Sequence, residues 1–232
     1  RRRDVTCIPY RWNGGKQELE NVQKWYCGKY RYEWMNDVIS GNDCGIKPIL
    51  MRYADVLLMA AEAANELNDL PYAKEQLRKV RFRAFKSNEA VDKYLEGIGS
   101  KDAMFKAIYR ERMLEFSCEQ IRKQDLIRWG LLKKSLDDVK GKMKAMLDHT
   151  TYTSELTDKT YDFSLVGTKV YYKYDADGET IQLHGLDFGE AGEPDGEGWT
   201  LYTSKKTDGT LEEEYIKLSL IHISEPTRLG MI

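Results

Sequence analysis

Two helical periodicities joined by a short turn constrain this chain more than any other feature. Their apolar positions recur at steps of three and four residues and are Tyr53, Leu57, Ala60, Ala64 and Leu67, then Ala73, Leu77, Val80 and Ala84. The turn "NDLP" separates the two runs, and Pro71 opens the second. The pattern predicts an αα-hairpin over about 53–84 whose alanine-lined face packs closely on a neighbouring helix. Asp55, Glu62 and Glu66 fall on the opposite side, which we expect to face solvent.

A third helix is predicted to begin after Ser100, a favourable N-cap residue, and to end near Cys118. On its helical wheel Glu111 and Glu115 lie one turn apart and share a face with aliphatic side chains. Like charges at this spacing are unfavourable, and desolvation makes them worse. Cations must therefore lie close to both carboxylates.

We expect these carboxylates to belong to a buried ionic network that orients helices. The expected members are Arg81, Arg83, Glu111, Glu115, Arg122, Asp125 and Arg128. An alternative makes Glu111 and Glu115 the acid and base of a glycosidase, since two carboxyl groups that flank a sugar bond perform that chemistry. The network is favoured because catalytic carboxyl groups need an open cleft, whereas these share a narrow face with aliphatic residues.

Outside the helices the sequence predicts loops and short strands. Residues 1–47 lack a helical period but hold seven aromatic residues between positions 10 and 34, against 11% in the whole chain. Further on, "DADG" and "TDGT" lie between alternating polar and apolar residues, which is typical of β-hairpins. Leu136, Val139, Met143 and Leu147 predict one more helix before those hairpins.

Composition excludes several classes of function. Lys and Arg number 36 against 38 Asp and Glu, so no nucleic-acid partner is expected. Four cysteines without a C-x-x-C pair and only three histidines predict no metal site, and no cofactor motif is present. No apolar run is long enough to span a bilayer, and the first residues lack the apolar core of a signal peptide, so we expect a soluble or truncated chain.

Three motifs in order resemble the SusD/RagB family of outer-membrane glycan-binding lipoproteins of Bacteroidetes. They are "MRYADVLLMAAEAANELND" at 51–69, "AKEQLRKVRFRAF" at 73–85 and "AIYRERMLEFSCEQIRKQDLIRWG" at 107–130. The resemblance runs from about residue 25 to 135 and matches the C-terminal half of the family. This chain has Glu119–Gln120 where the family usually has Glu-Gly, and Gln120 is interpreted as replacing a permissive kink residue.

The resemblance implies a mainly α fold with tetratricopeptide-like αα-hairpin packing, a loop-rich N-terminal part and a C-terminal segment with β-hairpins. We expect residues 1–136 to form the helical core fragment with its aromatic lead-in, and 137–218 to be a helix and β-hairpin segment of the same domain or an insertion. Residues 219–232, "SLIHISEPTRLGMI", resemble a translated sequencing adaptor, so we expect a non-native tail and give it no role.

Members of this family bind oligosaccharides at the cell surface and deliver them to a SusC-like TonB-dependent transporter, without catalysis and with a lipid anchor in the outer membrane. Sugar rings stack on aromatic faces, so the residues expected to bind glycan are Trp12, Trp25, Tyr26, Tyr30 and Trp34, with burial as the alternative for each. Trp129 is expected to be buried. A helical protein-interaction scaffold and the glycosidase remain as alternative functions.

Overall fold

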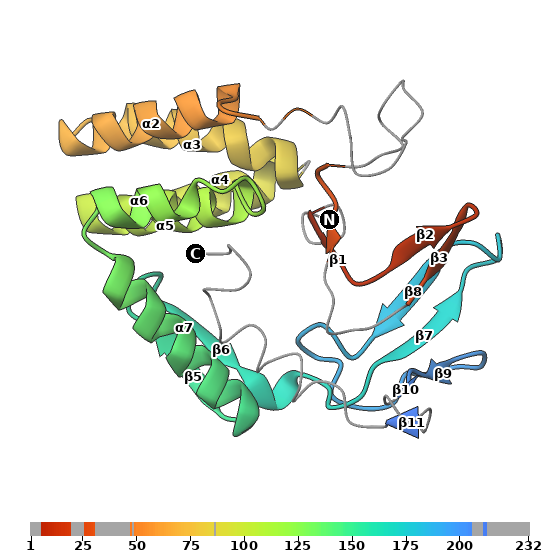
Figure 1. The fold of residues 1–232 in the computed structure, drawn as a ribbon. Coiled ribbons are helices and arrows are strands. Elements are labelled where there is room, and N and C mark those ends of the chain that lie inside the picture. Colours follow the sequence, from red (N-terminus) through yellow and green to blue (C-terminus); the bar gives the residue numbers. More distant parts are fainter. Residues whose placement is uncertain are drawn as a thin grey trace.

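The computed structural model describes residues 6–19, 26–30, 47, 49–85, 87–205 and 211–212. A group of stacked helices lies beside two small β regions (Figure 1). The helices are α2 (Tyr53–Glu66), α3 (Leu70–Phe85), α4 (Asn88–Glu96), α5 (Lys101–Glu115), α6 (Arg122–Arg128) and α7 (Leu132–Leu147). This arrangement confirms the mainly α prediction. The tail at 219–232 lies outside the described residues.

The predicted hairpin is present as α2 and α3, and both pack on α5. Its core consists of small and aliphatic side chains, among them Ala54, Leu58, Ala61, Ala73, Leu77, Val80, Met104 and Ile108, none more than 2% exposed. Alanines at the helix contacts let the helical axes approach closely, as the alanine-rich pattern predicts. Ser100 caps α5 by accepting a hydrogen bond from the Ala103 backbone N–H, which confirms the predicted start of that helix.

The buried face of α2 differs from the predicted one. Tyr53 is 72% exposed and Leu67 is 81% exposed, so the two ends of the predicted stripe face outward. Ala54, Leu58 and Ala61 are buried instead, and Asp55, which we placed toward solvent, is only 8% exposed. Leu57 and Ala64 are buried as predicted, at 8% and 6% exposed, so the buried arc is displaced by about one residue from the predicted stripe. Close contacts with α3 and α5 bury small side chains and one carboxylate on this arc.

The strands are short and antiparallel. They are β1 (Cys7–Ile8), β2 (Arg11–Asn13), β3 (Lys16–Glu18), β4 (Tyr26–Cys27), β5 (Thr151–Ser154), β6 (Lys159–Asp162), β7 (Tyr171–Tyr174), β8 (Ile181–His184), β9 (Thr200–Leu201), β10 (Ser204–Lys205) and β11 (Leu211–Glu212). β7 lies between β8 and β9, and the other strands pair two by two: β1 with β4, β2 with β3, β5 with β6, and β10 with β11. The β7–β8 hairpin around "DADG" and the β10–β11 pair that flanks "TDGT" agree with the predicted turns.

The β2–β3 hairpin near the N-terminus lies against the β7–β8 hairpin. Gln17 on β3 joins them, because its backbone N–H donates to the Glu179 carbonyl and its side-chain oxygen accepts from the Ile181 N–H at 2.9 Å each. Tyr174 on β7 donates its hydroxyl to the Gln17 carbonyl at 3.0 Å, and Lys16 Nζ lies 3.9 Å from the Tyr174 ring centroid. Segments more than 150 residues apart in sequence are thus fixed to each other.

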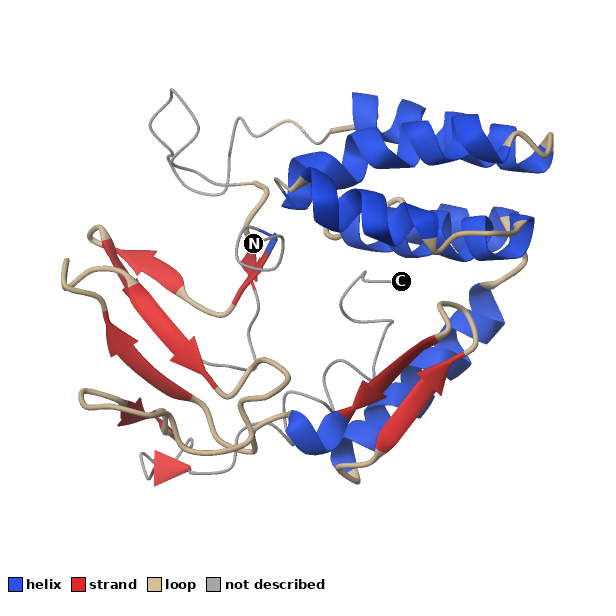
Figure 2. Ribbon diagram, turned by 180° about the vertical axis from the view of Figure 1, so that it is seen from behind, coloured by secondary structure: helices blue, strands red, loops and turns tan. Residues whose placement is uncertain are grey.

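The α7 helix packs along the β5–β6 hairpin (Figure 2). Gly141 permits this contact, since a β-carbon there would come within 2.4 Å of the Tyr152 ring. Sequence periodicity predicted α7, but it missed the β5–β6 hairpin and α4. Both are short elements: α4 has nine residues and each strand of the hairpin has four, so neither shows a long periodic pattern.

The chain turns sharply between α5 and α6. Cys118 and Gln120 both have left-handed backbone angles, with φ of 67° and 63°, although neither is glycine. At Gln120 this agrees with the interpretation that the residue occupies a position suited to glycine. A left-handed conformation costs an L-residue roughly 1–2 kcal/mol.

Replacing Gln120 with glycine should therefore raise the free energy of unfolding by about 1 kcal/mol, because glycine adopts φ near 60° without strain. Urea unfolding followed by circular dichroism measures the change. The control is Gln124→Gly at an exposed site on α6, where glycine should lower stability by about 1 kcal/mol. An equal loss in both variants would contradict the proposed strain at Gln120.

Candidate functional site

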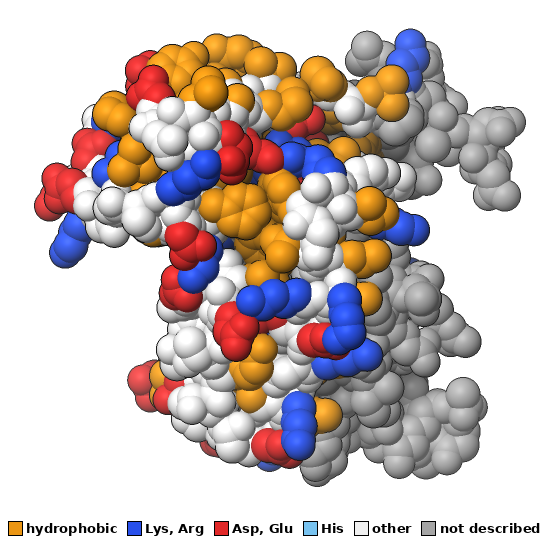
Figure 3. All heavy atoms as spheres, turned by 90° about the vertical axis from the view of Figure 1, so that its left-hand side faces the viewer, with side chains coloured by type: hydrophobic (Ala, Val, Ile, Leu, Met, Phe, Trp, Pro, Cys, Tyr) orange, Lys and Arg blue, Asp and Glu red, His pale blue; other side chains and the backbone are white. Residues whose placement is uncertain are grey.

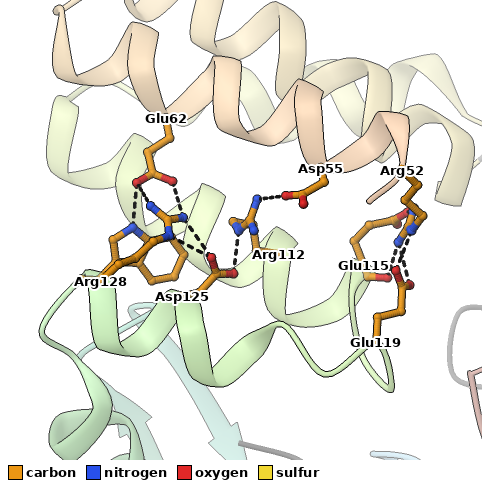
Figure 4. A network of polar contacts seen from close by, with 9 residues as sticks. Arg52, Asp55, Glu62, Arg112, Glu115, Glu119, Asp125 and Arg128 are labelled. Atoms are coloured by element: carbon orange, nitrogen blue, oxygen red, sulfur yellow. Dashed lines mark hydrogen bonds and ion pairs between the residues drawn. The ribbon is translucent and has the colours of Figure 1, made fainter. Parts of the chain in front are cut away.

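A ladder of acidic and basic side chains crosses the helical stack from α2 to α5 and α6 (Figure 4). At its centre Arg112 on α5 is only 4% exposed. Its Nη1 donates to Asp55 Oδ1 on α2 at 2.7 Å, and its Nε donates to Asp125 Oδ2 on α6 at 2.7 Å. One guanidinium therefore links three helices and neutralises two buried carboxylates.

One end of the ladder is built on Arg128 of α6. Its Nη2 donates to Glu62 Oε2 at 2.7 Å, and its Nε donates to Asp125 Oδ1 at 3.0 Å. Trp129 donates its indole N–H to Glu62 Oε1 at 2.8 Å. Burial alone would raise the pKa of Glu62, but these hydrogen bonds from Arg128 and Trp129 outweigh it and lower that pKa.

The other end is built on Arg52, which precedes α2. Arg52 Nη1 donates to Glu115 Oε1 at 2.5 Å and Arg52 Nε donates to Glu119 Oε2 at 2.7 Å. Lys29 pairs with Glu119, and Arg83 pairs with Glu115. Burial would raise the pKa of Glu119, yet hydrogen bonds from Arg52 and Lys29 hold it below its ordinary value.

Glu111 lies deepest, with no exposed surface. Arg81 on α3 donates to Glu111 Oε2 at 2.7 Å, and the Arg81 guanidinium carbon lies 3.6 Å from the centroid of the Tyr94 ring on α4. The carboxylate is thus covered by a cation that is itself covered by an aromatic ring. No sugar hydroxyl can reach Glu111 in this arrangement.

Arg122 differs from the other expected members of the network. Its guanidinium carbon lies 4.0 Å from the centroid of the Tyr109 ring, and among the described residues no ion pair joins it to a carboxylate. Burial is the main cause of a lowered pKa at Arg122. Arg122 also donates from Nη1 to the Tyr109 carbonyl at 3.4 Å, so contacts with Tyr109 stand in place of the salt bridge that we expected.

Sequence reasoning missed six charged residues that the structure brings into this ladder, and it placed two of them, Asp55 and Glu62, toward solvent. The six are Lys29, Arg52, Asp55, Glu62, Arg112 and Glu119. A helical wheel of α5 could have found Arg112, because it lies four residues after Ile108 and three before Glu115, both of which are buried. Asp55 and Glu119 become partners only through tertiary packing. Their pairing was not readable from local periodicity.

The ladder is suited to holding helices in place and offers little room for a ligand. At the Arg52 end a small hollow lined by Met51, Phe116 and Ile121 has space for about one water molecule. Among the residues that the structure describes, no group of three potential metal ligands converges. Every carboxylate in the ladder faces a guanidinium, an indole or an ammonium group.

Three of the aromatic residues expected to bind glycan, Trp12, Tyr26 and Tyr30, lie within the described part of the chain. Trp12 on β2 is 40% exposed, and the ring of Tyr10 meets it edge-on with centroids 6.4 Å apart. Tyr26 on β4 and Tyr30 just after it are half-buried. Trp25 and Trp34 lie outside the described residues. Trp129, expected in the core, is half-buried and packs 5.4 Å from Phe105, centroid to centroid.

Removing the central cation tests the ladder. Arg112→Met should lower the free energy of unfolding by about 3–5 kcal/mol, because Asp55 and Asp125 would stay buried without compensation. The matched control is Arg78→Met, which breaks the exposed pair with Asp92 and should cost at most about 1 kcal/mol. Urea denaturation compares the two variants, and similar losses would contradict a special role for Arg112.

Acidity should weaken the same ladder. The pKa values of Glu62 and Glu119 are lowered in the folded state, so their contribution is present above the unfolded pKa of about 4.3 and is lost as the pH falls through the folded values. In the unmodified protein the free energy of unfolding should fall between about pH 5 and pH 3, and in Glu119→Gln it should fall less over that range. Urea denaturation at each pH measures both. Glu96→Gln, at an exposed position on α4, should leave that pH dependence unchanged.

Comparison with known proteins agrees with this architecture. A family model described as the SusD family matches residues 4–186, more than three-quarters of the chain. SusD-like protein P25 of Formosa agariphila is 43% identical over 91 residues, which are 39% of this chain and 17% of that relative. The match therefore spans about a sixth of the relative's length. No solved structure matches the chain significantly. With a family match that includes the helical ladder and the β5–β8 hairpins, the chain belongs to the SusD family.

Proposed function

We propose that this protein binds oligosaccharides or polysaccharide fragments at the cell surface and delivers them to a SusC-like TonB-dependent transporter in the outer membrane. Membership in the SusD family carries this proposal. The role is nutrient uptake without catalysis. A lipid anchor in a longer form of the protein would hold it at the membrane, and no described helix is long and apolar enough to cross a bilayer.

The state of the two glutamates on α5 supports binding over hydrolysis. A glycosidase needs one carboxyl group that gives a proton and a second that attacks or activates water, both beside the sugar. Glu111 has no exposed surface, and Glu115 is 8% exposed and shared between Arg52 and Arg83. Carboxylates that are buried and held by guanidinium groups in this way leave no room beside them for a sugar bond.

An exposed aromatic ring near the N-terminus, that of Trp12, has the chemistry that sugar binding requires. Pyranose rings present flat C–H faces that stack on indole and phenol rings, while nearby polar groups reach the hydroxyls. Trp12 has an exposed ring, and Asn13 beside it donates a hydrogen bond to Glu18 across the β2–β3 hairpin at 3.1 Å. Trp12, Trp25, Tyr26, Tyr30 and Trp34 stay the proposed ligand residues.

A helical protein-interaction scaffold is the second candidate, because one outer face of the stack is apolar. Orange side chains gather along the upper part of Figure 3, where α2 and α3 lie. Tyr53, Val56 and Met59 follow one side of α2 and are 72%, 44% and 40% exposed, and Tyr72 on α3 is 46% exposed. An apolar face of this kind commonly contacts protein.

Two aromatic substitutions with similar exposure separate these candidates. Trp12→Ala should weaken glycan binding about tenfold or more, because stacking area is lost, whereas Tyr72→Ala should leave it unchanged. A glycan array identifies a ligand for the purified protein, and titration calorimetry then measures both variants.

The scaffold is favoured if the unmodified protein binds no glycan but co-purifies with a protein partner. That co-purification should then be lost in Tyr72→Ala. Release of reducing ends that Glu115→Gln abolishes without unfolding would instead establish a glycosidase. Binding of glycan with no release of reducing ends is the result that we expect.

A further inference from the structure

Three aromatic rings form a shelf beside α7 that the proposed function has not used. Tyr161 on β6 stacks on Phe163 with centroids 6.0 Å apart and planes 10° apart. Phe188 leans on both rings, with centroids 6.2 Å from Tyr161 and 5.7 Å from Phe163, and is 49% exposed. We call Tyr161, Phe163 and Phe188 the Tyr161 shelf.

The loop that carries Phe188 is held in place by backbone hydrogen bonds. The side-chain carboxylate of Glu190 accepts hydrogen bonds through Oε2 from the backbone N–H groups of Gly185, Leu186 and Asp187 at 2.8–3.1 Å. The Gly189 N–H donates to the Leu165 carbonyl at 2.8 Å. A loop fixed in this way presents its exposed ring without an ordering cost on binding.

Two lysines lie beside the Tyr161 ring of the shelf, and an arginine lies near one of them. Lys142 Nζ on α7 and Lys159 Nζ on β6 lie 5.0 Å and 4.9 Å from the Tyr161 centroid. Arg110 on α5 lies close enough to Lys159 to repel its charge. Lys142 is paired with Asp138 at 2.5 Å, but no described carboxylate forms an ion pair with Lys159 or Arg110.

This uncompensated charge has an electrostatic cost. Burial, with repulsion by Arg110 and Lys142, lowers the pKa of Lys159. Around Arg112, by contrast, the buried guanidinium is matched by carboxylates. Two cations beside the Tyr161 ring with a guanidinium nearby make this part of the surface locally positive, which favours an anionic group there.

We propose that the Tyr161 shelf binds a negatively charged sugar residue, a uronate or a sulfate ester, within an oligosaccharide. Phe188 presents its exposed face to the C–H surface of the sugar, while Lys159 and Arg110 receive the anionic group. This inference rests on the proposed glycan-binding function and adds the charge class of the ligand. The positive charge is local, since the whole chain carries a net charge of −2.

Matched ligands and variants test this site. Isothermal titration of the purified protein with oligogalacturonate, with a sulfated galactan oligosaccharide and with the neutral galactan of equal length compares acidic with neutral sugars. Lys159→Gln and Arg110→Gln should each weaken binding of the acidic ligand about tenfold, and Phe188→Ala should weaken it as well. The control is Lys133→Gln on α7, where the lysine is exposed and paired with Asp137.

Each outcome decides the inference. Tighter binding of either acidic ligand than of the neutral one, lost in Lys159→Gln and reduced by added salt, supports the site and identifies which anion it takes. Equal binding of neutral and acidic ligands, or unchanged affinity in Lys159→Gln and Arg110→Gln, overturns the inference while the glycan-binding function stands. If no glycan in the titrations or the array binds, both fail.

Discussion

A single buried guanidinium holds this helical stack together. Arg112 lies between Asp55 and Asp125, and each contact is 2.7 Å long. Burying three charges is costly unless the geometry satisfies all of them, and here a planar donor group faces two carboxylates from different helices. The rest of the ladder continues the same principle toward Glu62 at one end and Glu119 at the other.

That ladder also decides what the acidic residues cannot do. Carboxylates that are bound to guanidinium groups inside the stack are largely shielded from solvent, so they are poorly placed to meet a substrate. The helical half therefore acts as a frame, and we propose that recognition falls to residues outside it. The proposed residues are Trp12 on the β2–β3 hairpin and the Tyr161 shelf beside α7.

Sequence periodicity predicted much of this frame and failed where packing overrides it. The αα-hairpin, the Ser100 cap and the "DADG" hairpin follow from local patterns that tertiary contacts do not alter. The buried arc of α2 is displaced by about one residue from the predicted stripe, so that Ala54 and Ala61 are buried and the larger Tyr53 is exposed. Arg112 and Asp55 were missed because their pairing depends on how α2 and α5 dock. The cations of the Tyr161 shelf come from three distant segments, which no local pattern connects.

A double-mutant cycle between Arg112 and Asp125 tests the central claim most directly. The free energies of unfolding of Arg112→Met, Asp125→Leu and the double variant would be compared with that of the unmodified chain. The account predicts a coupling energy of at least about 2 kcal/mol, since each single variant leaves a buried charge that the double variant removes. A coupling below about 0.5 kcal/mol, as for independent surface charges, would contradict it.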